Sequence, residues 1–322
     1  MKKLLLVLFS AILLLTFAGC GCEDEIVCNG EHVEEIIPAK APTCKEDGLT
    51  EGKKCAICDD IIVMQEIIPK LSHTYEDDYE CTVCKQVAKE STGLAFELDT
   101  KTNTYTFVGI GDCTDKEIVI PIKYDGLDVT KIKSFALYNN ETIEELTFSK
   151  NIKEIEDYAL SNCTSLKRIT VSTKNEAFKS ADGNLYTRDG KKLVQYALGK
   201  AESSPSLIDE VEEIGSCAFA GNQYLKKISF GDNVKIIGVS AFVNCHYIES
   251  ISLNKVEKIS DNAFYGCAAL TEITIPETVT EMGQGIFYGC VGLNISCEAK
   301  EKPSGWSEFW NNGDFPVIWG KQ

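Results

Sequence analysis

The sequence predicts a solenoid of the α/β repeat type, in which short parallel strands alternate with helical or 3-10 corners. A 17-residue pattern, Ile-x-x-x-Ala-Phe-x-x-Cys-x-x-Leu-x-x-Ile-x-Ile, recurs along the chain, most clearly at 237–253 and 259–275. Four phenylalanines hold the same place in it and are spaced 23, 22 and 23 residues apart: Phe219, Phe242, Phe264 and Phe287. A fixed period in this range is typical of repeat proteins.

Each position of the pattern predicts a local structure. Ile273 and Ile275 alternate with Thr274, which indicates a short strand with one buried face. Pro276 then favours a turn, and Val279 begins a second short buried segment. The Ala-Phe pair that follows predicts a corner that places its ring in the core.

One copy of the pattern cannot fold alone. Its five or six apolar anchors contribute roughly 8 to 15 kcal/mol of burial, whereas ordering one copy's backbone costs roughly 22 to 44 kcal/mol. Stacked neighbours supply the missing burial, as in solenoids generally. Leu137 and Leu160, also 23 residues apart, hold the phenylalanine position in two earlier copies.

Most cysteines of the second half share one position of the repeat: Cys163, Cys245, Cys267 and Cys290, with Asn140 and Asn222 in two other copies. We expect a small side chain there that packs or hydrogen-bonds in a buried corner. A catalytic or metal-binding thiol is disfavoured, because no histidine shares this period. Cys217 and Cys297 lie off the column and leave an isolated disulfide open.

The first residues have the layout of an export signal. Lys2 and Lys3 precede an apolar run to Phe17, which is too short for a membrane-spanning helix. The segment LTFAGC resembles a bacterial lipobox, which implies cleavage after residues 1–19 and lipidation of Cys20. Two acyl chains hold a protein stably on a bilayer, so we expect a tether on the extracellular face and no other membrane contact. An ordinary secreted protein with a free Cys20 is the alternative.

Composition argues against two classes of function. Loss of residues 1–19 would move the formal charge from −17 to −19, which disfavours nucleic acid as a partner. The three histidines, His32, His73 and His246, accompany no Gly-x-Ser-x-Gly motif, phosphate loop or paired acid cluster. We therefore expect a protein that is not an enzyme.

The stretch 20–91 is rich in cysteine and predicts a separate module. Two Cys-x-x-Cys pairs 26 residues apart, together with two histidines, fit tetrahedral zinc coordination. The most economical site uses Cys44, Cys55 and Cys58 with His73, or with His32 in its place, and leaves a second, poorer pair at 81–84. Disulfides and free thiols remain alternatives, since the segment is expected outside the cell.

From about residue 93 to 320 the chain resembles the BspA-type leucine-rich-repeat proteins of bacterial surfaces. The segment 92–131 is similar to their N-terminal cap, 132–297 to their repeats, and 298–322, with its Gly-Trp and second Trp, to their C-terminal cap. An insertion at about 173–206 has two Asp-Gly pairs and predicts a β-hairpin. The resemblance implies a leucine-rich-repeat solenoid that adheres to other proteins or cells.

The outward side chains of the first strand predict a binding face. Hydroxyls recur there about one strand spacing apart, roughly 5 Å, and form a ladder suited to a polar peptide or glycan. The candidate binding residues are Thr147, Arg168, Thr170, Lys227, Ser229, Ser252 and Thr274. Polar residues that only solvate a sheet are the alternative, and the hairpin with Tyr186 and Tyr196 is a second candidate site. We expect binding of a protein or glycan, with zinc capture at the surface as the alternative function.

Overall fold

The computed structural model describes residues 32–68, 70–71, 73–76 and 79–321. The predicted export signal and Cys20 lie outside the described residues. The chain divides into two compact units, Met1–Leu71 and Ser72–Gln322. In the described part of the chain, no helix is long and apolar enough to cross a membrane.

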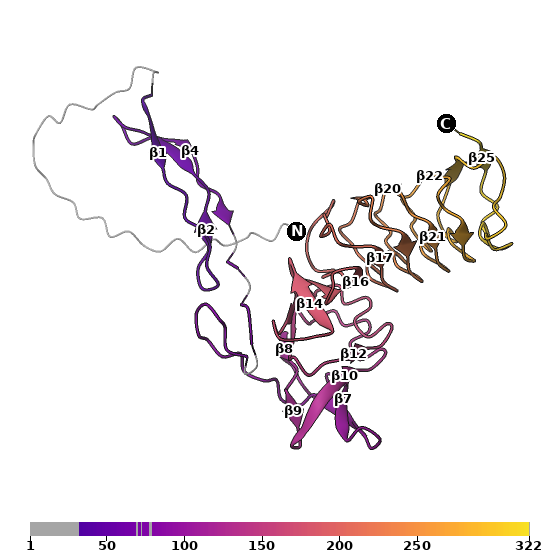
Figure 1. Cartoon of the computed structure of the whole chain (residues 1–322). Coiled ribbons are helices and arrows are strands. Elements are labelled where there is room, and N and C mark those ends of the chain that lie inside the picture. Colours follow the sequence, from indigo (N-terminus) through magenta and orange to yellow (C-terminus); the bar gives the residue numbers. More distant parts are fainter. Residues whose placement is uncertain (1–31, 69, 72, 77–78, 322) are drawn as a thin grey trace, which may run out of the picture. The chain divides into compact units, whose positions relative to one another are not determined.

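The described residues of the first unit form two small antiparallel sheets (Figure 1). One sheet has the order β1-β3-β4 and the other pairs β2 with β5. The strands are β1 Glu34–Ile37, β2 Gly48–Leu49, β3 Gly52–Cys55, β4 Ile61–Val63 and β5 Ile67–Ile68. Most of the unit's large apolar side chains stay exposed, while Cys44 and Cys55 are buried.

In the second unit, a cap of five strands precedes the repeats: β6 Ala95–Asp99, β7 Thr104–Gly109, β8 Glu117–Val119, β9 Lys123–Tyr124 and β10 Leu127–Ile132. β6 and β7 form a hairpin, and β7 then pairs in parallel with β10. The fully buried ring of Phe107 on β7 starts the core. The cap therefore provides a ready edge on which the first repeat can stack.

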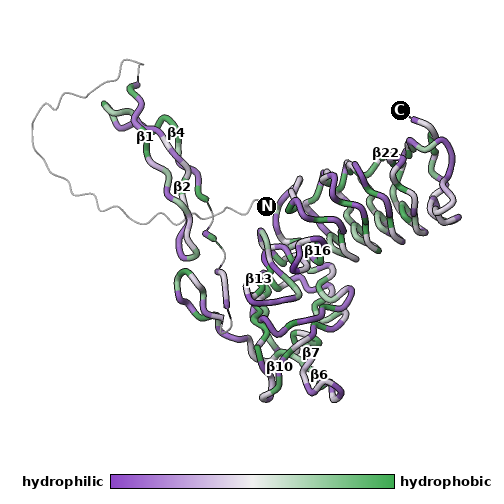
Figure 2. Tube along the Cα trace, viewed as in Figure 1, coloured by the Kyte–Doolittle hydropathy of each residue, from purple (hydrophilic) through white to green (hydrophobic). Residues whose placement is uncertain are grey.

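The repeats stack so that each contributes one strand to each of two sides of the solenoid (Figure 1). The first side carries β8 with β11 Glu145–Phe148, β13 Arg168–Val171, β18 Lys227–Ser229, β20 Ser250–Ser252, β22 Glu272–Ile275, β24 Asn294–Cys297 and β25 Val317–Trp319. The second side carries β10 with β12 Glu154–Ile155, β17 Glu213–Ile214, β19 Ile236–Ile237, β21 Lys258–Ile259 and β23 Glu281–Met282. All paired repeat strands are parallel, as the sequence predicts, and equivalent positions face each other, such as Ile228 and Ile251. Hydrophobic and hydrophilic residues alternate around the turns (Figure 2).

The predicted insertion contains the antiparallel pair β14 Phe178–Ala181 and β15 Asn184–Thr187. Asp182 and Gly183 form its turn with φ of 49° and 72°, the left-handed values that a two-residue hairpin turn requires. The next strand, β16 Lys192–Gln195, pairs with β15 and then in parallel with β17. The insertion is thus built into the second side of the solenoid.

The phenylalanines of the repeat form one interior file. Successive ring centroids lie 4.9 Å apart for Phe219 and Phe242, 5.5 Å for Phe242 and Phe264, and 5.8 Å for Phe264 and Phe287. All four side chains are fully buried. Trp310 packs edge-on against Phe287 at 6.4 Å and closes the file, as the similarity of the C-terminal segment to the family's cap implied.

The corners of the described repeats are chains of separate turns in place of the expected helical or 3-10 segments. In one corner the N–H of Ala241 donates to the carbonyl of Gly238 at 3.2 Å, a 3-10-like contact. Left-handed backbone at Ser240 and Asn244, with φ of 53° and 58°, prevents the turns from joining into a helix. The N–H of Phe242 donates instead to Ala263 of the next repeat at 2.8 Å, so the corners also bind the stack together.

The cysteine column hydrogen-bonds between repeats, as expected. The Sγ of Cys245 donates to the carbonyl of Phe219 at 3.1 Å, and that of Cys290 donates to Phe264 at 3.2 Å. Burial raises the pKa of Cys163 and of Cys245 to about 12. The thiols of Cys163 and Cys245 therefore stay protonated and act as small buried donors.

Candidate functional site

The predicted ladder is open along the C-terminal half of the first side. Ser250 and Ser252 of β20 point outward and are exposed, while Ile251 between them is buried. The same alternation of exposed and buried positions occurs on β18 and β22. It leaves the predicted residues Lys227, Ser229, Ser252 and Thr274 accessible.

The ladder is not continuous, because its first two hydroxyls are covered. Thr147 on β11 and Thr170 on β13 are only 6% and 7% exposed. Arg168 is half-buried and pairs with Glu145 at 2.8 Å. A ligand therefore cannot reach the first two rungs as the chain lies, and the expectation of one unbroken ribbon is wrong in this half.

A segment from the cysteine-rich stretch lies along these covered strands. We call residues 73–76 and 79–91 the tyrosine arm, and they belong to the same unit as the repeats. The hydroxyl of Tyr79, which is buried, donates to the carbonyl of Ile120 beside β8. Burial, with a smaller contribution from nearby Glu145 on β11, raises the pKa of Tyr75 to about 12. The N–H of Thr173, just after β13, donates to the carbonyl of Tyr75 at 3.0 Å, so the arm lies beside β8, β11 and β13. The hairpin of the insertion also contacts β13, where the N–H of Ile169 donates to the carbonyl of Gly183 at 2.8 Å.

The open half contains a groove of about 810 Å³ over β20, β22 and β24. Its polar lining residues are Ser250, Ser252, Asn254, Thr271, Glu272, Thr274, Asn294, Ser296, Glu298 and Lys321. Ser252 donates to the side-chain oxygen of Asn254 at 2.6 Å, and Lys321 donates to Ser296 at 3.1 Å. These contacts orient hydroxyl, amide and charged groups at the surface, where an extended polar ligand can hydrogen-bond.

Several groove residues were missed by sequence reasoning. Asn294 and Ser296 hold the next positions of the ladder because each lies 22 residues beyond its equivalent on β22, so the period alone would have found them. Asn294 is exposed, whereas Ser296 is only 8% exposed and accepts a hydrogen bond from Lys321. Asn254 follows β20 by two residues, and its place beside Ser252 depends on the turn. Lys321 comes from the C-terminal cap and carries no periodic signal.

The hairpin candidate does not offer its tyrosines to a ligand. Tyr186 and Tyr196 are 1% and 0% exposed and belong to the core. The ring of Tyr196 stacks on Phe219 at 4.7 Å and extends the interior file. The prediction of a binding site at these rings is therefore wrong, since both serve packing.

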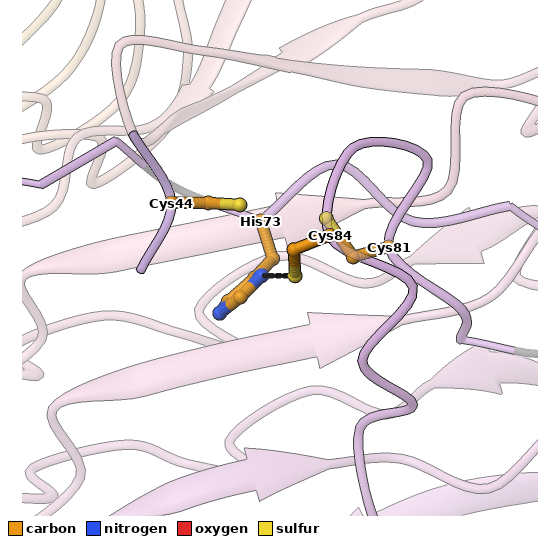
Figure 3. A group of neighbouring side chains, drawn as sticks. All are labelled: Cys44, His73, Cys81 and Cys84. Carbon is orange, nitrogen blue, oxygen red and sulfur yellow. Dashed lines mark hydrogen bonds between the residues drawn. The ribbon is translucent and has the colours of Figure 1, made fainter. Parts of the chain in front are cut away.

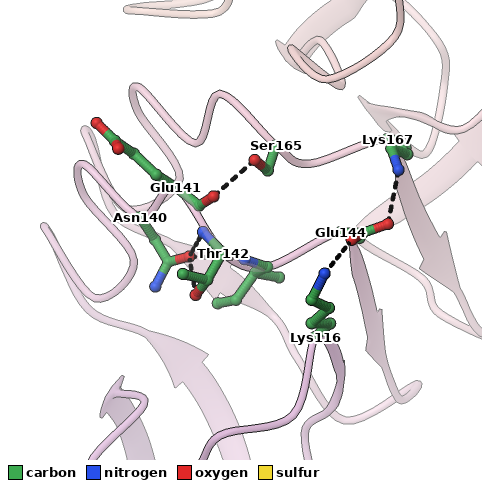
Figure 4. Close-up of polar contacts among 8 residues, drawn as sticks. Lys116, Asn140, Glu141, Thr142, Glu144, Ser165 and Lys167 are labelled. Atoms are coloured by element: carbon green, nitrogen blue, oxygen red, sulfur yellow. Dashed lines mark hydrogen bonds and ion pairs between the residues drawn. The ribbon is translucent and has the colours of Figure 1, made fainter. Parts of the chain in front are cut away.

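Ion pairs connect the starts of the strands in the covered half. Glu144, just before β11, accepts hydrogen bonds from Lys116 at 2.8 Å and from Lys167 at 2.6 Å (Figure 4). The two lysines lower the pKa of Glu144 to about 2. Because each lysine precedes a neighbouring strand, this cluster favours the observed register of the strands.

The predicted metal-ligating residues are divided between two Cys/His groups. In the first unit, His32, Cys55 and Cys58 place their ligand atoms within 4.8 Å of one another. In the second unit, His73 lies beside Cys84, with Nδ1 3.4 Å from Sγ, and Cys81 is its neighbour (Figure 3). Cys44 is buried in the first unit. His73 thus approaches the second Cys-x-x-Cys pair, while His32 approaches the first.

The electrostatics of the second group favour thiolate at Cys81. Burial opposes the charged form, but hydrogen bonds from the Cys84 backbone, the His73 side chain and the Val83 backbone outweigh it. Together they lower the pKa of Cys81 to about 5. Thiolates are the form in which cysteine binds metals.

The described geometry accords with a known repeat family. A sequence profile of the BspA type leucine rich repeat region matches residues 103–183 and 199–304 in six copies, more than half of the chain. The chain belongs to the BspA-type leucine-rich-repeat family. BspA-type repeats are typical of bacterial surface proteins. A comparison with curated proteins finds no match.

Solved structures of leucine-rich-repeat proteins resemble this BspA-type chain. The pneumococcal vaccine antigen PcpA matches with 27% identity and a TM-score of 0.54 over 67% of this chain and 50% of that one. The leucine-rich-repeat protein of T. pallidum matches with 23% identity and a TM-score of 0.41 over 64% of this chain and 91% of that one. This chain thus corresponds to about half of PcpA.

Proposed function

We propose that this BspA-type protein is a non-catalytic receptor that binds an extended polar segment of a protein or glycan in the open groove over β20, β22 and β24. The observation that carries the proposal is the exposed row of polar side chains that neighbouring repeats hold in register. Leucine-rich-repeat proteins typically bind proteins. The parallel stack repeats equivalent side chains at the spacing of neighbouring strands, roughly 5 Å, so that one ligand can contact several repeats.

The polarity of the groove favours a hydrogen-bonding ligand. Glu272 and Glu298 line the groove together with Lys321, so a ligand can pair with both signs of charge. Serine, threonine and asparagine side chains offer donors and acceptors along the same line. Specificity would then come from hydrogen bonds that a mismatched ligand leaves unmade.

A binding array tests the groove. The full chain is applied to extracellular proteins and glycans, and each hit is titrated with the double variant Ser252→Lys/Thr274→Lys. We expect at least a tenfold rise in Kd, about 1.4 kcal/mol, because two lysines block the groove and replace hydroxyls. Thr102→Lys/Thr280→Lys is the matched control, since both threonines are exposed outside the groove. Equal affinity of the two double variants for a ligand would refute binding of that ligand in the groove.

The protein is further proposed to be tethered at the cell surface through lipid on Cys20. The support is the sequence LTFAGC after a short apolar run, and two acyl chains suffice for stable anchoring. Labelling with a fatty-acid analogue in the native host should mark the wild type and miss Cys20→Ser. Equal labelling of both proteins would exclude this anchor.

A further inference from the structure

Both Cys-x-x-Cys segments adopt the same compact turn. The N–H of Asp59 donates to the carbonyl of Cys55 at 3.0 Å, and the N–H of Lys85 donates to Cys81 at 3.0 Å. Asp59 and Lys85, each directly after its second cysteine, have left-handed φ of 58° and 63°. Two segments with different intervening residues thus fold into one conformation, which turns both thiols of a pair to the same side.

One histidine completes each turn. Nδ1 of His32 lies 3.6 Å from Sγ of Cys58, and Nδ1 of His73 lies 3.4 Å from Sγ of Cys84. For tetrahedral zinc with a Zn–S bond of about 2.3 Å and a Zn–N bond of about 2.05 Å, sulfur and nitrogen lie roughly 3.6 Å apart. The two observed separations match this value. Each group therefore presents one sulfur and one nitrogen at the spacing of a tetrahedral site, with the second sulfur within 4.8 Å of both.

The described part of the first unit buries few apolar side chains. Ile36, Ile61 and Met64 of the first unit are exposed, whereas Cys55 is fully buried. Strands this short and this open do not hold together by burial alone, and small folds of this kind depend on metals or cross-links. Cysteines buried among exposed aliphatic residues point to bonding at sulfur as the stabilising contact.

We propose that His32, Cys55 and Cys58 bind one zinc ion, and that His73, Cys81 and Cys84 bind a second. Each cysteine binds the metal as its thiolate, any cysteine still protonated releases its proton to solvent, and the imidazole nitrogen donates its lone pair. The metal keeps its oxidation state, and a ligand from outside each group fills its fourth position. The first ion links the end of β3 to the segments that carry His32 and Cys58, and the second holds the turn of the tyrosine arm at Cys81 and Cys84 to His73.

Metal analysis of the full chain, purified without chelators or oxidants, tests this assignment. We expect two zinc ions per chain, and one in each of Cys58→Ser and Cys84→Ser. Cys113→Ser and His246→Gln are the matched controls and should retain two, because both residues lie outside the groups. Cys44 belongs to the metal site predicted from the sequence. The zinc content of Cys44→Ser therefore measures whether Cys44 supplies a further ligand. Zinc below about a tenth of an ion per chain, or a content unchanged in both site variants, would overturn the proposal.

Cobalt substitution and thiol counting make the test independent of the variants' folding. Cobalt added to the metal-free wild type should give a thiolate charge-transfer band that saturates at two equivalents and disappears on zinc addition. Alkylation of the denatured wild-type chain without reductant should modify all cysteines of both groups. If cysteines of these groups escape alkylation and the chain is lighter by two hydrogens per cysteine pair than the fully reduced chain, they form disulfides, and the proposal is overturned.

Discussion

Replacement of Phe242 by alanine should destabilise the solenoid more than almost any other single substitution. The ring is fully buried at the middle of the interior file. Its centroid lies 4.9 Å from that of Phe219, 5.5 Å from that of Phe264 and 6.0 Å from that of Phe230. Burial and the cavity left behind account for about 3 to 5 kcal/mol in such substitutions. This range already includes the loss of aromatic pair contacts, worth about 0.5 to 1.5 kcal/mol each, and three neighbouring rings place Phe242→Ala in its upper half. We therefore expect a loss of about 4 to 5 kcal/mol.

Phe242→Leu should cost much less than Phe242→Ala. Leu137 and Leu160 hold the same position in two earlier repeats and are also buried, so the corner accepts a leucine. We expect a loss of about 1.5 kcal/mol, in the range of hydrophobic substitutions that nearly conserve volume. The contrast between the two variants separates the loss of the ring from the loss of the buried side chain as a whole.

Urea denaturation followed by far-ultraviolet circular dichroism measures both losses. Tyr247→Ala is the matched control, because this tyrosine belongs to the same repeat and is 56% exposed. Its substitution should change the free energy of unfolding by less than about 0.5 kcal/mol. If Phe242→Ala destabilises no more than Tyr247→Ala, the reasoning from the interior file fails.

Two further predictions follow from ionisation. Because burial raises the pKa of Cys163 and Cys245 to about 12, both thiols should resist iodoacetamide at about pH 8 until the chain unfolds. Rapid labelling of either thiol in the native chain would contradict this burial. The contribution of the two thiols to stability is complete below the pKa of cysteine in the unfolded chain, about 8.5, and should be lost as pH rises towards 12. The pKa of Glu144 is lowered to about 2 by its two lysines, so its contribution is present above about pH 4.5 and is lost as pH falls through 2. Urea midpoints of wild type and Glu144→Gln should therefore differ at neutral pH and converge near pH 2, and a constant difference would exclude this ion pair as the cause.

The periodic part of the fold could be predicted from the sequence. A residue that recurs every 22 or 23 positions must occupy equivalent places in a stack, so the file of phenylalanines and the column of cysteines followed from spacing alone. The same logic would have extended the ladder to Ser296. The Asp182-Gly183 pair likewise predicted its turn, since both residues tolerate left-handed backbone.

The contacts that escaped prediction are aperiodic. Nothing in the repeat indicates that the tyrosine arm lies beside β8, β11 and β13, because the arm precedes the repeats and carries no copy of the pattern. Tyr196 was expected at the surface of a hairpin, yet its ring continues the file beyond Phe219. Spacing also could not assign each histidine to a cysteine pair, since that choice depends on how the short strands fold back.

A double-mutant cycle between neighbouring phenylalanines tests the stacked solenoid most directly. Leucine substitutions at Phe242 and Phe264, alone and together, should give a coupling energy of about 0.5 to 1.5 kcal/mol. The same cycle between Phe219 and Phe287, which have two rings between them, should give a value within about 0.5 kcal/mol of zero. No coupling between the neighbours, or equal coupling for the distant pair, would contradict a single file in which each repeat rests on the next.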